Sequence, residues 1–197
     1  MMYTTSEEFE VLHGLRVKGI TQPDDVAAAI GLDAALVERV LECAVDKEHA
    51  RKRTGGRVQG YMLTAAGRER HAELRTDRGP TQLDDLSAAY DEFLGPNREF
   101  KALTTKWQTE ADGDPAVVLL ELLAIDERVG KVLSLAVASV SRMRAYEPRF
   151  KAALDAFQNG ETSALARPMS GSYHDVWMEL HEDLLLMLGR ERTDADE

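Results

Sequence analysis

The segment RKRTGGRVQGYMLT, at residues 51–64, constrains the fold more than any other part of the chain. Gly55 and Gly56 lie in its middle, and a glycine pair supplies the positive φ angles that a hairpin tip requires. The residues on both sides suit short strands, so we predict a β-hairpin. Thr64 is then placed to cap a further helix that continues to about Leu74. A small sheet is therefore predicted in a chain whose other patterns are helical.

Three helices are predicted before the hairpin, at residues 6–18, 23–30 and 33–47. Apolar residues recur in them at spacings of three and four, as on one face of a helix. Gly31 ends the second helix with a tight turn, and Asp33 is a favourable N-cap for the third. Two helices joined by a short turn that contains a glycine are typical of a helix-turn-helix.

The order of these elements resembles the winged-helix domain of MarR-type and PadR-type transcriptional regulators, over about residues 6–75. The sequence YMLTAAG at 61–67 is similar to the Tyr-x-Leu-Thr-x-x-Gly pattern that commonly ends the second wing strand in those families. The resemblance implies that residues 33–47 are the recognition helix and residues 51–61 the wing. It also implies double-stranded DNA as the partner and a homodimer that binds two half-sites.

A group of basic residues on and near the wing forms the predicted DNA-binding set. Cations at a hairpin tip suit contacts with phosphates or with the minor groove, where each one displaces counterions. The alternative is a solvated hairpin whose charges serve only solubility. The predicted set is Arg39, Lys47, Arg51, Lys52, Arg53 and Arg57.

The predicted recognition helix carries acids on its outward side. Base readout normally uses basic, amide or hydroxyl side chains, and Arg39 is the obvious reader here. Asp33, Glu38 and Glu42 would instead repel phosphates. A second function class therefore stays open, an adaptor whose winged helix binds a protein partner, such as an enzyme, and not DNA.

Charge and composition limit the cellular compartments in which the chain can be expected. The formal net charge of −11 is uneven, with 12 basic and 13 acidic residues at 1–79 but 12 basic and 22 acidic residues at 80–197. The one cysteine, Cys43, fits a reducing compartment. The most apolar stretch, residues 117–140, holds five charged residues and so does not suit a bilayer. We expect a cytoplasmic protein without membrane contact.

The fold class predicted from the whole chain is mainly α, an N-terminal winged helix with a small β-hairpin wing followed by an all-α helical bundle. Helices of the bundle are predicted to end at Gly95-Pro96 and to meet near Gly130. The bundle is expected to dimerise and to be a candidate domain for a small-molecule effector. The predicted divisions are a winged-helix domain at 1–76, the bundle at 80–190 and a disordered tail at 191–197.

The last predicted helix, at about residues 172–188, places His174, Trp177 and His181 on one face, with Tyr173 beside them. Tyr173, His174 and Trp177 are therefore candidates for a ligand pocket. The alternative is that Tyr173 and Trp177 pack in the bundle while the histidines are partly exposed. Two turns, or about 10 Å along the axis, separate the histidines, which does not suit a shared metal. We predict no metal, no cofactor and no enzymatic activity.

Overall fold

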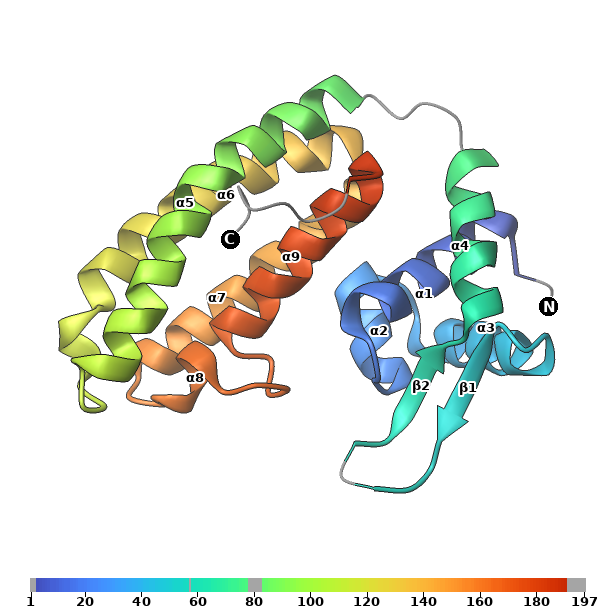
Figure 1. Ribbon diagram of the computed structural model, residues 1–197, viewed down its shortest axis with the longest axis horizontal. Coiled ribbons are helices and arrows are strands. Elements are labelled where there is room, and N and C mark those ends of the chain that lie inside the picture. Colours follow the sequence, from blue (N-terminus) through green and yellow to red (C-terminus); the bar gives the residue numbers. More distant parts are fainter. Residues whose placement is uncertain (1–2, 57, 78–82, 191–197) are drawn as a thin grey trace. The chain divides into compact units, whose positions relative to one another are not determined.

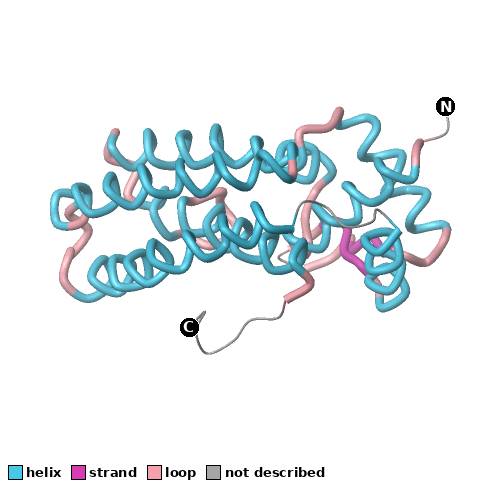
Figure 2. Tube along the Cα trace, turned by 90° about the horizontal axis from the view of Figure 1, so that it is seen from above, coloured by secondary structure: helices cyan, strands magenta, loops and turns pink. Residues whose placement is uncertain are grey.

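The computed structural model describes residues 3–56, 58–77 and 83–190. The chain divides into two compact units, Met1–Thr81 and Gln82–Glu197. Helices dominate both, and the described residues contain one two-stranded antiparallel sheet (Figures 1 and 2). The prediction of a mainly α chain with a small hairpin is confirmed. None of the helices in the described part of the chain is long and apolar enough to cross a membrane.

The described residues of unit 1 form four helices and a hairpin, and local signals set their ends. The Asp33 carboxylate accepts a hydrogen bond from the Leu36 amide at 3.0 Å, so it caps the third helix as predicted. Gly31 ends the second helix in the left-handed region, with φ of 70°. The elements are α1 (Thr5–Lys18), α2 (Pro23–Ile30), α3 (Ala34–Asp46), β1 (Ala50–Arg53), β2 (Gly60–Leu63) and α4 (Ala65–Asp77).

The core of unit 1 is formed by apolar side chains of α1 that pack against those of α2 and α3. Leu12 of α1, Val26 of α2 and Val40 of α3 are fully buried in it. His13 and His71 are buried as well, and their ring nitrogens Nδ1 and Nε2 form a hydrogen bond of 2.9 Å between α1 and α4. This bond gives the two imidazoles a polar partner inside an apolar core, as buried polar groups require.

The hairpin is fastened to the start of α2 by a short bridge. Thr21 and Tyr61 exchange backbone hydrogen bonds of 3.1 and 2.8 Å, which adds one bridge beside β2. Gly60 precedes this contact with φ of 139°, and a Cβ there would lie 2.3 Å from the Thr21 carbonyl oxygen. Only glycine fits at residue 60, because both the backbone angle and the close approach exclude a side chain.

The start of α4 is held against the loop between α3 and β1. The Thr64 hydroxyl accepts a hydrogen bond from the Gly67 amide at 3.0 Å and donates one to the Glu48 carbonyl at 2.6 Å. Thr64 therefore caps α4 as predicted and ties it to the preceding loop. A Cβ on Gly67 would lie 1.8 Å from the His49 carbonyl oxygen, so this contact requires a glycine.

We expect Gly67→Ala to lower the free energy of unfolding by about 1–3 kcal/mol, because the new methyl group must push a fixed backbone carbonyl aside. Urea unfolding followed by circular dichroism measures the change. Gly95→Ala is the matched control, since its Cβ would meet only the movable end of Arg128, at 2.6 Å from Nη2. Equal effects of the two substitutions would contradict the role given to Gly67.

Between residues 83 and 190, unit 2 is a bundle of helices with two short 3₁₀ turns. In Figure 1, α5 and α6 lie side by side, with α7 and α9 next to each other in the rest of the bundle. The elements are α5 (Leu83–Thr109), η1 (Pro115–Val117), α6 (Leu119–Ser139), η2 (Ser141–Ala145), α7 (Tyr146–Gln158), α8 (Ser163–Ala166) and α9 (Tyr173–Leu188).

Two predicted helix ends in unit 2 are wrong. Helix α5 continues through Gly95-Pro96, and α6 continues through Gly130. A proline inside a helix costs about 3 kcal/mol and a glycine about 1 kcal/mol. Burial of one face offsets these costs, since Phe93 and Phe100 flank the first site and are fully buried. Most helical stability in proteins comes from such packing and not from propensity.

Candidate nucleic-acid interface

Helix α3 divides into a buried and an exposed side as the sequence predicts. Val37, Val40 and Leu41 are fully buried against the rest of unit 1. All seven outward positions are exposed, and they are Asp33, Ala34, Ala35, Glu38, Arg39, Glu42 and Asp46. The outward surface of α3 is therefore acidic, with Arg39 as its one basic residue.

The hairpin presents its cations on two different faces. Arg51, Lys52 and Arg53 are all exposed, and successive side chains of a strand point to opposite sides. Arg51 and Arg53 therefore share one face, and the Arg53 Nε donates a hydrogen bond of 3.2 Å to the Gly55 carbonyl near the tip. Arg57, also predicted to bind DNA, lies outside the described residues.

Lys52 extends from the other face of the hairpin. Its ammonium group lies 5.0 Å from the centre of the Tyr61 ring. The Tyr61 side chain raises the pKa of Lys52, and the carboxylates of Glu38 and Glu42 on α3 add to this effect. Lys52 is therefore within the electrostatic field of the acidic surface of α3, which offsets part of its charge.

A cavity of about 300 Å³ lies where the hairpin meets the start of α4. Two cations, Arg51 of β1 and Arg68 of α4, border it together. The backbone amides at a helix N-terminus carry a partial positive charge and suit an anion such as phosphate. The other lining residues are Met62, Leu63, Thr64 and Ala65. The two arginines and the first amides of α4 are the groups at this cavity that can bind an anion, beside a lining that is otherwise mostly apolar.

Arg68 is a functional candidate that the sequence reasoning missed. It lies one helical turn after the cap residue Thr64, so the cap fixes its place beside the hairpin. The signal was present in the sequence, because a basic residue four positions after a helix cap lies near the helix N-terminus. Only the pairing of β1 with β2 shows that Arg51 reaches the same cavity.

The remaining predicted cations lie with the N-terminal segment. The Lys47 ammonium donates a hydrogen bond of 3.2 Å to the Tyr3 hydroxyl, which donates one of 3.1 Å to the Cys43 sulfur. The bond to Tyr3 raises the pKa of Lys47. The pKa of Glu7 is lowered, first by hydrogen bonds with Thr4 and to a smaller degree by the charge of Arg39. The predicted set is therefore divided between the hairpin and the start of the chain.

The three residues predicted to border a ligand pocket lie within and beside an aromatic core. Tyr173 and Trp177 are fully buried, and the Trp177 ring stacks on Phe100 with centroids 4.4 Å apart. The Trp177 Nε1 donates to the Asn97 side-chain oxygen at 2.9 Å. His174 is half-buried, with its ring centroid 6.0 Å from that of Phe100. Packing accounts for Tyr173 and Trp177 without a ligand.

The polar groups of Tyr173 and Asp126 are also hydrogen-bonded to each other inside the protein. The Tyr173 hydroxyl donates a hydrogen bond of 2.9 Å to the Asp126 carboxylate. Burial raises the pKa of Asp126 and of Tyr173. His181, expected to be partly exposed, is instead buried. Its ring packs against Phe93, with the two ring centroids 5.1 Å apart.

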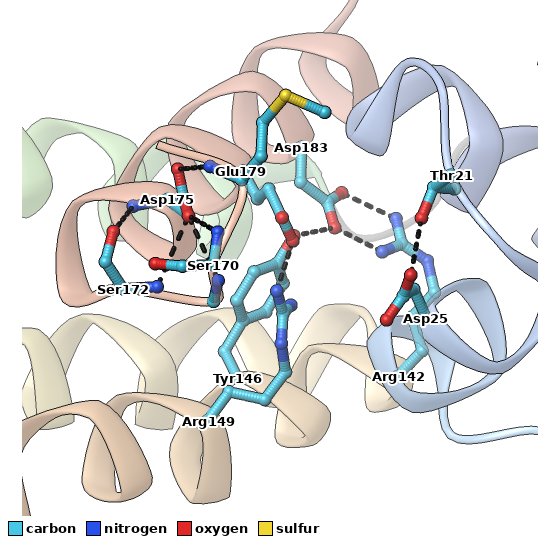
Figure 3. Close-up of polar contacts among 12 residues, drawn as sticks. Thr21, Asp25, Arg142, Tyr146, Arg149, Ser170, Ser172, Asp175, Glu179 and Asp183 are labelled. Carbon is cyan, nitrogen blue, oxygen red and sulfur yellow. Dashed lines mark hydrogen bonds and ion pairs between the residues drawn. The ribbon is translucent and has the colours of Figure 1, made fainter. Parts of the chain in front are cut away.

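A buried polar network ties α9 to η2 and α7 (Figure 3). The Asp183 carboxylate accepts two hydrogen bonds from the Arg142 guanidinium, one of them at 2.6 Å, and one of 3.0 Å from the Tyr146 hydroxyl. A second ion pair joins Arg149 to Glu179. Burial places the pKa of Tyr146 well above its ordinary value, so its hydroxyl stays a donor. The network fixes the position of α9. Its charged and hydroxyl groups bind one another and are not directed at a ligand.

No group of three or more metal-ligating side chains is found in the described ranges. Comparison of the chain with protein-family models, with curated proteins and with solved structures finds no match.

Proposed function

We propose that the chain is a DNA-binding transcriptional regulator of the winged-helix type, similar to the MarR and PadR regulators. The observation that supports this proposal is that Arg51 of β1 and Arg68 of α4 border one cavity beside the start of α4, in a unit where the hairpin follows the helices α2 and α3. Arg53, on the same hairpin face as Arg51, extends this basic surface toward the tip. The proposed regulator acts in the cytoplasm without enzymatic activity.

In the proposed complex the hairpin provides most of the attraction to the duplex. Arg51, Arg53 and Arg68 contact phosphates, and α3 offers only Arg39 for base readout. A homodimer would place two hairpins on half-sites about 34 Å apart. The bundle of unit 2 is the proposed dimerisation domain and the proposed receptor for a small-molecule effector.

The double substitution Arg51→Ala with Arg53→Ala tests the proposal. We expect DNA affinity to fall at least tenfold, and the slope of log affinity against log salt to decrease by about two, one for each lost phosphate contact. Fluorescence anisotropy on a genomic duplex and on the upstream region of the gene, at several salt concentrations, measures both quantities. Salt-dependent binding by the unmodified protein is the first expected result.

The matched control removes the same charge elsewhere. Arg98 and Arg167 are exposed residues of unit 2, and Arg98→Ala with Arg167→Ala changes the net charge equally. We expect it to leave the salt slope unchanged. A similar loss of affinity in both double variants would show that net charge alone acts, and unchanged affinity in the hairpin variant would remove the hairpin from the interface.

A protein-binding adaptor is the second candidate function, favoured by the acidic outward surface of α3. Four acids are exposed there, namely Asp33, Glu38, Glu42 and Asp46. Their carboxylates would repel the phosphates of a duplex. An adaptor would use this surface to bind a basic face of another protein. Absence of DNA binding at low salt by the unmodified protein would favour it over the regulator.

A further inference from the structure

Helix α6 carries an apolar surface that unit 2 does not cover. Four large apolar side chains are exposed among the described residues, and three of them, Leu120, Leu123 and Leu135, belong to α6. Leu120 is 80% exposed. The small residues Ala124, Gly130, Ser134 and Ala138 are exposed on the same helix. Single exposed apolar residues are ordinary, but a row of them along one helix indicates an interaction surface.

These residues share one side of α6 and surround a pair of opposite charges. At 100° per residue, Leu120, Glu127, Lys131 and Ala138 project in nearly the same direction. Glu127 and Lys131 form an exposed ion pair of 3.1 Å at the centre of this surface. The surface therefore has an apolar region at each end and one charge of each sign in its middle.

The pattern is symmetric about Val129. Glu127 and Lys131 are equally far from it in sequence, and so are Leu120 and Ala138. A second copy of α6 laid antiparallel across this point would therefore place Glu127 of each chain beside Lys131 of the other. The same arrangement sets the large Leu120 against the small Ala138. A two-fold interface requires such self-complementarity, in which each residue of a pair contacts the other in both directions.

A cavity beside this surface fits the same arrangement. It has a volume of about 370 Å³ and is lined by Gly130, Leu133, Ser134, Val137, Arg144 and Glu147. A Cβ on Gly130 would meet no atom within 4 Å, so this part of α6 is open to a close neighbour. Leu123 lies on the same flank of α6 as the cavity but on the other side of Val129. The two-fold rotation therefore brings Leu123 of the second copy to the cavity.

We propose that the chain forms a homodimer through antiparallel packing of α6 against α6 of a second copy, with the two-fold axis running between the two helices at the level of Val129, whose own side chain is buried in the core. Two salt bridges between Glu127 and Lys131 set the register, and Leu123 of each chain fills the cavity beside α6 of the other. The proposed function already includes a homodimer, and this inference rests on that part of it. It does not depend on DNA binding. Its test is therefore made without DNA, so the two proposals can fail separately.

Charge reversal tests the register on the full-length protein. We expect the unmodified chain to sediment as a dimer at about 10 μM, and Glu127→Lys to become monomeric because four lysines then meet at the centre. Lys131→Glu is also expected to become monomeric, because four glutamates then meet at the centre. Mixing the two variants pairs every lysine with a glutamate of the other chain, so a heterodimer is expected to form. Sedimentation equilibrium measures all four samples.

The exposed pair Lys151 and Asp155 on α7 provides the matched control, since it has the same i, i+4 spacing. Lys151→Glu is expected to leave the dimer unchanged, and circular dichroism checks that every variant is folded. A monomeric unmodified chain would overturn the proposal. A dimer that survives Glu127→Lys, or variants that stay monomeric after mixing, would overturn the α6 register.

Discussion

Asp183→Asn is expected to lower the free energy of unfolding by about 3–5 kcal/mol, the range for removing one partner of a buried ion pair. The side chains of Asp183 and Arg142 are 1% and 7% exposed, so water cannot replace the lost charge. Asparagine keeps the shape of the side chain and one acceptor, but the guanidinium then remains buried without the carboxylate charge. Urea unfolding followed by circular dichroism measures the effect.

Asp155→Asn is the matched control, because Asp155 also pairs with a cation but is 48% exposed. Exposed pairs contribute little, so a change within about 0.5 kcal/mol is expected. Replacing both partners, as Arg142→Met with Asp183→Leu, should recover part of the loss by removing both buried charges. Recovery stays incomplete because the Tyr146 hydroxyl loses its acceptor. Equal effects of Asp183→Asn and Asp155→Asn would show that the buried pair does not hold α9.

Trp177→Ala is expected to lower the free energy of unfolding by about 3–5 kcal/mol, since truncating a buried aromatic leaves a cavity in the core. Trp177 is 1% exposed, stacks on Phe100 and donates to Asn97, so apolar contacts and a buried hydrogen bond are lost together. Chemical unfolding of the purified variant, followed by circular dichroism, gives the free energy.

Trp107→Ala is the control for the loss of a tryptophan. Trp107 is only half-buried and meets the core through an edge contact with Phe157, at 5.4 Å between centroids. We expect a clearly smaller loss of stability. Equal stability of the Trp177→Ala variant and the unmodified chain would mean that Trp177 borders a space and not a packed core, which would support the predicted ligand pocket.

The parts of the fold that the sequence predicts are those decided by neighbours along the chain. The caps at Asp33 and Thr64, the turn at Gly31 and the hairpin around Gly55 each depend on a few consecutive residues. Asp33, for example, caps α3 through an amide only three residues away. The exposure of the α3 acids follows from helical period alone, and the structure confirms it.

The parts that could not be predicted depend on contacts between distant segments. Helix α5 passes through Pro96 because its flanking aromatics pack on residues more than 70 positions away, as Phe93 does on Trp177. The burial of His181 has the same origin. In the candidate site, Arg68 and Arg51 lie 17 positions apart and meet only because the hairpin folds back. Sequence periodicity carries no information on contacts between residues that are distant in the chain.

The division into two units gives each of them its own spectroscopic reporter. Both tryptophans of the chain, Trp107 and Trp177, belong to the Gln82–Glu197 unit, so tryptophan fluorescence, excited at a wavelength that tyrosine does not absorb, reports on that unit alone. Cys43, the single cysteine, belongs to the other unit and is half-buried, so its rate of labelling by a thiol reagent reports on the opening of that unit. The two signals, recorded on one sample, show whether the halves melt together or in turn.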